Sequence, residues 1–148
     1  MDLKEYWKKR DFTKTKEPKG RIKKTESKKR IFVIQEHQAR HLHWDLRLEM
    51  QGVLKSWALP KIPPRKAGEK RLAVQVEDHP LDYATFEGTI PKGSYGAGQV
   101  KIWDKGTFQV LELKPKKILI DVRGKKLKGK YALINFKNKN WLFFKIKK

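Results

Sequence analysis

The sequence predicts an all-β protein, a compact closed barrel of about eight strands preceded by a short N-terminal helix. Three observations support this fold class. Apolar and polar residues alternate along most of the chain, turn-forming residues separate the alternating stretches, and helical periodicity is almost absent. Of the 148 residues 38% are hydrophobic and 11% are aromatic, which is sufficient for one core. We therefore treat residues 1–148 as a single domain.

The first 30 residues are mostly polar and precede the alternating region. We expect a short helix over residues 2–9, because Pro18 and Gly20 interrupt any longer helical segment.

The clearest strand covers residues 42–50, where every even position is apolar and every odd position is polar or charged. A strand with one buried face has this pattern. Alternation begins at Ile31, and further strands are expected at 53–59, 71–77, 100–103, 107–113, 118–122, 130–135 and 141–146. The separators are rich in turn-forming residues, among them the segments at 51–52, 104–106, 123–125 and 138–140. The glycine-rich segment 93–98 is expected to be a tight strand connection, since no helical pattern follows it.

Charge divides the chain into three parts. The net charge is +21, with 13 Lys/Arg against 5 Asp/Glu in residues 1–30 and 13 against 2 in residues 112–148. Residues 31–111 carry 11 against 9 and contain all four histidines. A field this positive attracts polyanions, of which the nucleic-acid backbone is the commonest in a cell. We expect a catalytic core at 31–111 and two basic flanks that bind a polyanion.

Several classes of protein are excluded by composition. Cysteine is absent, so there is no disulfide framework and no thiolate zinc site. The sequence around Met1 has no apolar stretch typical of a signal peptide, and no apolar run reaches the roughly 20 residues that span a bilayer. We expect a cytoplasmic protein, a monomer, with no membrane partner.

The polar face of the clearest strand carries the residues that indicate chemistry. His43 and Asp45 are two positions apart on a strand, so their side chains point the same way about 7 Å apart. An imidazole and a carboxylate together suit Mn²⁺, Zn²⁺ or Fe²⁺ better than Ca²⁺. A third ligand is expected from His37 or His79. Arg47 follows on the same face, and a guanidinium beside a metal ion is the arrangement that a phosphate group requires.

A second stretch is expected to contribute to the same pocket. Arg71 and His79 have the same parity, so an unbroken strand would direct both side chains to one face.

Several longer motifs resemble the 3′-phosphoesterase domain of bacterial and archaeal DNA ligase D. They keep their order and spacing across roughly residues 4–110, and more loosely to residue 145. The motifs are 32–37 (FVIQEH), 42–49 (LHWDLRLE), 55–61 (KSWALPK), 71–74 (RLAV), 77–83 (EDHPLDY), 86–91 (FEGTIP), 95–98 (YGAG) and 103–106 (WDKG).

This resemblance implies a compact β-barrel with the site in its mouth. It implies removal of a 3′-terminal ribonucleoside and then of the 3′-phosphate, which leaves a 3′-OH for a polymerase or ligase. The metal ion would be Mn²⁺, with Zn²⁺ or Co²⁺ as alternatives, held by His37, His43 and Asp45.

The resemblance also implies roles for eight further residues. By this resemblance, Arg47 and His79 would engage the scissile phosphate. The rest of the pocket would be formed by Tyr83, Arg71 and Lys61, and activity on the terminal nucleotide would involve Arg10, Asp11 and Glu17.

The implied partner is a DNA primer-template with a 3′ ribonucleotide or 3′-phosphate end. A separate DNA ligase, polymerase or Ku-type end-joining protein is a further expected partner. The family's domain is usually fused to polymerase and ligase modules, for which 148 residues have no room, so we expect a stand-alone version.

Two other functions are compatible with parts of the sequence. His43, Asp45 and His79 together match the two-histidine, one-carboxylate ligand set of non-haem iron oxygenases, which are also β-barrels. A non-catalytic nucleic-acid-binding barrel would use the positive charge alone.

Overall fold

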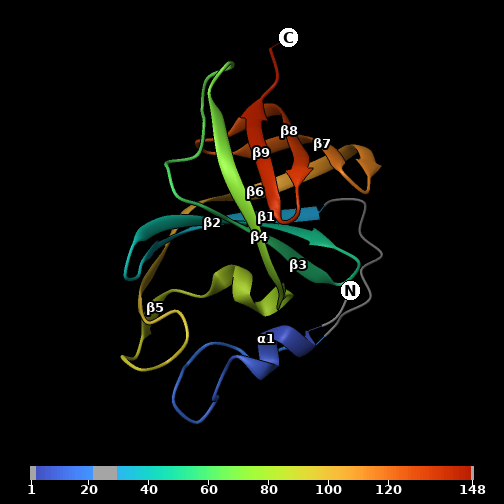
Figure 1. Ribbon diagram of the computed structural model, residues 1–148. Coiled ribbons are helices and arrows are strands. Elements are labelled where there is room, and N and C mark those ends of the chain that lie inside the picture. The colour runs from blue at the N-terminus through green and yellow to red at the C-terminus, as the bar shows by residue number, and fades with distance from the viewer. Residues whose placement is uncertain (1–2, 22–29, 148) are drawn as a thin grey trace.

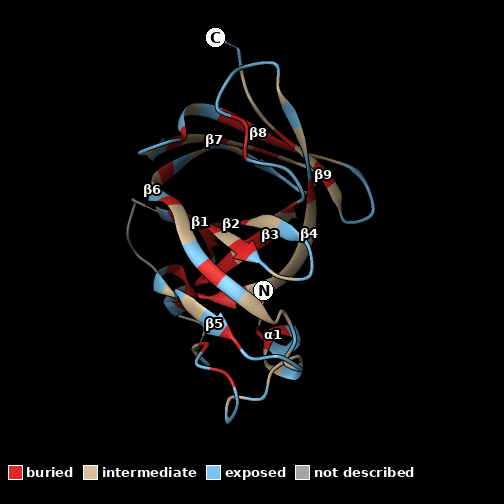
Figure 2. Cartoon of the chain, turned by 90° about the vertical axis from the view of Figure 1, so that its left-hand side faces the viewer, coloured by how far each residue is buried: buried red, intermediate tan, exposed pale blue. Residues whose placement is uncertain are grey.

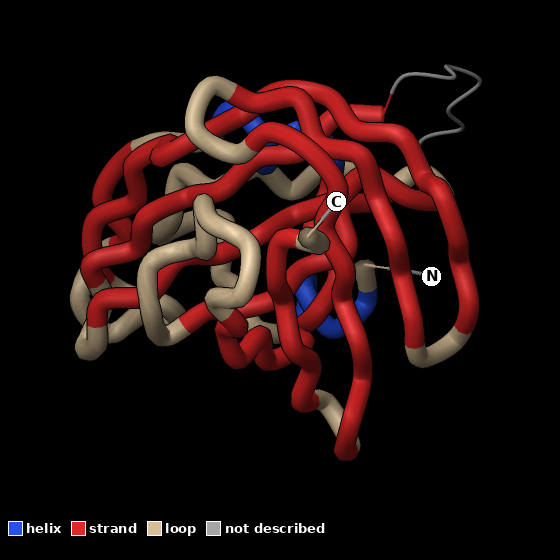
Figure 3. Tube along the Cα trace, turned by 90° about the horizontal axis from the view of Figure 1, so that it is seen from above, coloured by secondary structure: helices blue, strands red, loops and turns tan. Residues whose placement is uncertain are grey.

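The protein is an all-β barrel, as predicted, in a computed structural model that describes residues 3–21 and 30–147. In these ranges the strands are β1 (Arg30–Gln38), β2 (Leu42–Met50), β3 (Val53–Leu59), β4 (Lys70–Pro80), β5 (Gly88–Ile90), β6 (Gly98–Lys114), β7 (Lys117–Gly124), β8 (Lys128–Lys137) and β9 (Asn140–Lys145). The helices are short, α1 (Lys4–Lys8) and the 3-10 helix η1 (Leu81–Thr85), and strands make up most of the chain (Figure 3). Asp2, at the start of the expected helix, lies outside the described residues.

Eight strands close the barrel, in agreement with the prediction. All neighbours pair antiparallel in the order β1-β2-β3-β4-β9-β8-β7-β6, and β1 pairs with β6 to complete the circle. The short strand β5 adds to the free edge of β6. Figure 1 shows the C-terminal strands above β1–β3, with α1, η1 and β5 below them. No helix within the described ranges is long and apolar enough to cross a bilayer.

Two apolar clusters lie on opposite sides of the β1–β4 layer. The main core fills the barrel and takes Phe32 and Ile34 from β1, whereas Val33 between them belongs to the second cluster. The second cluster contains Tyr6 and Tyr83, so it lies between the outer side of this layer and the covering N-terminal segment and η1. In Figure 2 buried segments are visible both between the strand layers and below β1–β3.

The expectation of a single buried face on strand 42–50 is therefore wrong. Every residue from Asp45 to Met50 is buried, including the polar positions Asp45, Arg47 and Glu49. The reason is that α1, the N-terminal segment and η1 cover the face that alternation alone would leave in water.

The expected turn at 104–106 is also wrong, because β6 runs through it as one continuous strand. The register against β1 shifts here, which makes Trp103 an extra residue and bends β6. The Asp104 carboxylate accepts backbone hydrogen bonds of 2.9–3.1 Å from residues 125–127, in the β7–β8 connection. Gly106 is needed for close strand approach, since a Cβ there would lie 2.0 Å from the carbonyl oxygen of Arg123. Both turn-forming residues thus serve long-range packing.

Candidate active site

Most of the predicted site residues gather on the outer side of the β1–β4 layer. Even-numbered residues of β2, such as Leu46 and Leu48, pack in the main core, so the odd-numbered ones point away from the barrel interior. A pocket of about 350 Å³ lies on this outer side. The predicted residues in its lining are Arg10, His37, His43, Asp45, Arg47, His79 and Tyr83. The expectation of a site in the mouth of the barrel is wrong, because these side chains face the covering segments instead.

His37, His43 and Asp45 form a group that fits one metal ion, the one such group of three within the described ranges. His37 and His43 are directly opposite each other on β1 and β2. Asp45 Oδ2 is 3.6 Å from His37 Nδ1, and Asp45 Oδ1 is 3.3 Å from His43 Nε2. Two ligands at about 2.1 Å from a tetrahedral ion lie roughly 3.4 Å apart, so the spacing suits a shared ion.

Backbone carbonyls orient both histidines toward this position. His37 Nε2 lies 2.7 Å from the carbonyl oxygen of Gly96, and His43 Nδ1 lies 3.0 Å from that of His41. A carbonyl oxygen can only accept, so these two nitrogens carry the protons and donate. In the neutral rings the lone pairs are then on His37 Nδ1 and His43 Nε2, the two nitrogens that face Asp45 and that donate to it when a ring is protonated. Metal-binding histidines are typically held in this way.

Neighbouring charges keep Asp45 ionised although it is 6% exposed. Burial raises the pKa of its carboxyl, but the Arg47 charge and hydrogen bonds from His37 and His43 outweigh burial and hold that pKa well below its usual range. Burial lowers the pKa of His43, but the contacts with Asp45 outweigh burial and the net effect is a raised pKa. A metal ion must displace that proton, so we expect metal binding to weaken as the pH falls.

Arg47 lies beside this group with one donor nitrogen unused. Its Nε donates to Gln35 Oε1 at 2.7 Å, and its Nη2 is 3.4 Å from Asp45 Oδ2. Its Nη1 is buried and has no hydrogen-bond partner among the described residues. Leaving a buried guanidinium nitrogen unpaired is costly, and this nitrogen is available to an anion that enters the pocket.

Gln35 holds Arg47 in place and was not singled out from the sequence as a site residue. Its Nε2 donates to the carbonyl oxygens of Tyr83 and Phe86 at 2.8 and 3.0 Å, which leaves Oε1 to accept from Arg47. Gln35 is directly opposite Asp45 in the β1–β2 register. That register is the signal that would have identified it.

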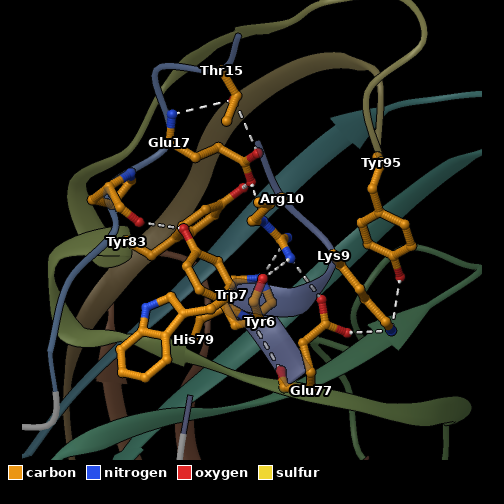
Figure 4. A network of polar contacts seen from close by, with 12 residues as sticks. Tyr6, Trp7, Lys9, Arg10, Thr15, Glu17, Glu77, His79, Tyr83 and Tyr95 are labelled. Carbon is orange, nitrogen blue, oxygen red and sulfur yellow. Dashed lines mark hydrogen bonds and ion pairs between the residues drawn. The ribbon is translucent and has the colours of Figure 1, made fainter. Parts of the chain in front are cut away.

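The N-terminal segment contributes Arg10, which lies between two buried carboxylates (Figure 4). Arg10 Nε donates to Glu17 Oε2, and its Nη1 donates to Glu77 Oε2, both at 3.0 Å. The Tyr83 hydroxyl also donates to Glu17 Oε2, at 2.7 Å, and Lys9 Nζ donates to Glu77 Oε1 at 3.2 Å. Paired charges therefore attach this segment to β4 and η1. Glu77 is a second residue that sequence reasoning missed, although it lies two positions before His79.

His79 is neutral in this environment. Burial lowers the pKa of His79, and the charges of Arg47 and Arg10 lower it further, to well below its usual value. Its Nδ1 is 3.0 Å from the carbonyl oxygen of Glu77 and carries the proton, while its Nε2 accepts from Arg10 Nη2 at 3.3 Å. Burial raises the pKa of the Tyr83 hydroxyl far above its usual value, so this group stays protonated.

Two of the remaining predicted residues belong to the N-terminal segment. Glu17 lies behind the pocket, where it joins Arg10 to Tyr83. Asp11 is exposed, and its Oδ1 accepts from the backbone N–H and hydroxyl of Thr13 at 3.0 and 2.6 Å. Asp11 therefore orders the turn that leads to Glu17.

The other two lie outside the pocket lining. Lys61 is exposed, and Arg71 Nε donates to the carbonyl oxygen of Ile62 at 2.8 Å. The expectation that strand periodicity brings Arg71 and His79 to one face is wrong. The register of β4 against β3 shifts between residues 76 and 79, and this bulge inverts the alternation. The roles of Lys61 and Arg71 stay predictions from the resemblance.

Known proteins resemble this chain over almost all of its length. Residues 35–135 match the family described as the DNA Ligase D 3′-phosphoesterase domain. The multifunctional non-homologous end joining protein LigD of Mycolicibacterium smegmatis is 47% identical over 150 residues, which cover 93% of this chain and 20% of that protein. LigD of Pseudomonas aeruginosa is 47% identical over 153 residues, which cover 98% of this chain and 18% of that protein. LigD of Mycobacterium tuberculosis is 44% identical over 149 residues, which cover 98% of this chain and 20% of that protein. The chain spans about a fifth of the length of these relatives.

Alanine at His37, His43 or Asp45 should weaken metal binding by on the order of a hundredfold or more, because each change would remove one of the three candidate ligands. His79→Ala should keep the ion, since His79 is engaged by Arg10 and the Glu77 carbonyl. The measurement is a Mn²⁺ titration followed by electron paramagnetic resonance at about pH 8, where histidines are neutral. Loss of the ion in His79→Ala together with retention in His37→Ala would show that the ligand assignment is wrong.

Proposed function

The chain belongs to the DNA ligase D 3′-phosphoesterase domain family, and we propose that it is a metal-dependent phosphoesterase that heals the 3′ ends of DNA. The observation that carries this proposal is the unpaired, buried Nη1 of Arg47 in the pocket that also contains the three candidate metal ligands. An anion-binding nitrogen next to a cation site is the arrangement that phosphoester cleavage uses.

The proposed substrate is a DNA end that carries a 3′-terminal ribonucleoside or a 3′-phosphate, and the proposed product is a 3′-OH for a polymerase or ligase. The pocket, at about 350 Å³, is near the lower limit of ligand pockets, which suits a phosphate with its attached sugar. The relatives' names place those proteins in non-homologous end joining, which supports a DNA end as the substrate.

His37, His43 and Asp45 would hold the ion, and their mixed nitrogen and oxygen donors suit Mn²⁺, with Zn²⁺ or Co²⁺ as alternatives. A bound divalent ion polarises a phosphoryl oxygen and lowers the pKa of a bound water. Asp45 can act as a ligand to the ion because its low pKa keeps the carboxylate anionic at neutral pH.

Arg47 is proposed to donate from Nη1 to a phosphoryl oxygen and to stabilise the charge that develops there. Gln35 and Asp45 hold two other sides of the guanidinium, so it needs little rearrangement when the phosphate arrives. His79 is neutral beforehand, but a phosphate anion raises the pKa of a neighbouring imidazole. We infer that His79, which already carries one proton on Nδ1, takes up a second proton on Nε2 from solvent as the substrate binds. It then donates from Nε2 to the phosphoryl group.

The N-terminal residues are proposed to act on the terminal nucleotide. Arg10 lines the pocket, Glu17 holds Arg10, and Asp11 orders the turn before Glu17. Tyr83 is proposed to contribute its ring, which lies 4.8 Å from the Arg47 guanidinium carbon, while its hydroxyl stays bonded to Glu17.

The two rival functions receive less support. An iron oxygenase built on His43, Asp45 and His79 would need His79 in the ligand group, which contains His37 instead. A non-catalytic nucleic-acid-binding barrel has no use for buried metal ligands in a pocket. Addition of Mn²⁺ and a 3′-phosphorylated primer separates the three: the phosphoesterase releases phosphate, the oxygenase requires oxygen and a 2-oxo acid, and the binding module releases nothing.

Arg47→Ala and His79→Ala should each lower the turnover number by roughly 10²- to 10³-fold, because each removes one donor to the phosphoryl group. The measurement is steady-state release of phosphate from a 3′-phosphorylated primer-template with Mn²⁺. Asp121→Asn, on β7 and outside the pocket lining, is the control and should match the wild type. Turnover near the wild-type value in either alanine variant would remove that residue from the mechanism.

The basic flanks are proposed to bind the phosphate backbone of the primer-template. If so, the logarithm of affinity should fall with the logarithm of salt concentration, with a slope of about −0.9 per phosphate neutralised on duplex DNA. Changing the exposed Lys125, Lys126 and Lys128 together to glutamine should flatten this slope without changing single-turnover cleavage at saturating DNA. Fluorescence anisotropy of a labelled duplex measures the slope. An affinity for DNA that does not change with salt concentration would mean that the charge of +21 serves solubility alone.

A further inference from the structure

Tyr95 lies at the rim of the pocket, on the loop that connects β5 and β6. Two successive turns shape this loop, closed by backbone hydrogen bonds of 3.1 Å from Ser94 to Pro91 and from Ala97 to Ser94. Gly96 follows with φ of +74°, a conformation that other residues rarely adopt. The expected strand connection is therefore present, and it also forms part of the pocket wall.

The position of Tyr95 is fixed relative to the metal-binding group. The carbonyl oxygen of the next residue, Gly96, accepts from His37 Nε2 at 2.7 Å. On the other side, Lys9 Nζ donates to the Tyr95 hydroxyl at 3.4 Å, and the Arg10 guanidinium carbon lies 5.3 Å from the ring centre (Figure 4). The loop thus contacts the candidate metal site through Gly96 and the cationic N-terminal segment through the Tyr95 ring.

Contacts within the chain cover only part of this ring. Tyr95 is 48% exposed, whereas the other pocket tyrosine, Tyr83, is 2% exposed. Of the large apolar side chains that are exposed in the described ranges, Tyr95 is the one in the pocket lining. Its hydrogen bond from Lys9, at 3.4 Å, is long and therefore weak. A half-exposed aromatic face at a pocket entrance is suited to a planar ligand group.

The chemistry of the pocket identifies that group. On the proposed function the phosphate lies beside Arg47, which is buried, so the attached nucleoside extends toward the exposed side of the pocket, where Tyr95 lies. The base is the planar part of a nucleoside, and every base has a face that stacks on an aromatic ring. Lys9 Nζ lies over the ring, 4.8 Å from its centre, and together with Arg10 it adds positive charge where the sugar-phosphate chain would pass.

We propose that Tyr95 forms a nucleobase-binding site, on which the base of the nucleotide whose phosphate occupies the pocket stacks. This inference rests on the proposed function, because it assumes a phosphate beside Arg47. Stacking does not read hydrogen-bond patterns, so the site accepts all four bases and distinguishes a nucleotide from an abasic or purely inorganic phosphate.

A cycle of four affinities tests the proposal. The protein and its Tyr95→Ala variant are each titrated, without added metal so that no turnover occurs, with two 3′-phosphorylated oligonucleotides that differ in one feature. One carries a base on the last nucleotide and the other has an abasic sugar there. The wild type should bind the first roughly 5- to 100-fold more tightly. Tyr95→Ala should bind both with the affinity that the wild type has for the abasic oligonucleotide.

Two further variants act as controls. Tyr95→Phe keeps the ring and should restore the preference for the base. Leu72→Ala removes a large apolar side chain that is 39% exposed but lies outside the pocket lining and outside the basic flanks, and it should behave as the wild type. Retention of the full base preference in Tyr95→Ala would overturn the proposal.

Failure of the nucleobase site and failure of the proposed function give different results. Mn²⁺-dependent phosphate release without a Tyr95-dependent base preference would contradict the nucleobase site alone. A Tyr95-dependent base preference in a protein that releases no phosphate would support the nucleobase site and contradict the phosphoesterase.

Discussion

The structure depends on the burial of a carboxylate and a guanidinium side by side on one face of β2. Asp45 and Arg47 are 6% and 3% exposed, and their side chains approach to 3.4 Å. Burying two charges is costly unless each is fully paired, and here the pairing is left incomplete. Asp45 is shared with two histidines, and Arg47 keeps one nitrogen without a partner in the part of the chain that the structure describes. The cost is retained where a cation and an anion are proposed to bind.

The covering layer makes this burial possible. The N-terminal segment and η1 lie over the outer face of β1–β4, and they are attached by charged groups as well as by apolar contacts. Arg10 pairs with Glu17 and Glu77 and also lines the pocket. The same ion pairs therefore hold the cover and shape the site. This explains why so many polar residues are buried in a small barrel whose interior is apolar.

Local patterns predicted the strands and part of the site, whereas long-range pairing decided the rest. The strand at 42–50 was predictable because alternation and turns act over neighbouring residues, and alternation also brought His43 and Asp45 together. The placement of His37 came only from the family resemblance, because it depends on the register between β1 and β2. Gln35 was missed for the same reason. The continuity of β6 could not be predicted, since Asp104 bonds to residues about twenty positions away.

The central claim is that the 3′-terminal phosphate lies next to an ion held by His37, His43 and Asp45. Phosphorus-31 NMR of a 3′-phosphorylated oligonucleotide bound to the protein tests this claim directly, because paramagnetic Mn²⁺ broadens nearby phosphorus signals. The His79→Ala variant is the suitable form, since it should keep the ion and turn over slowly. We predict that Mn²⁺ broadens the terminal phosphorus signal well before the internal ones. Even broadening of all phosphorus signals, or a terminal signal that stays sharp, would contradict the claim.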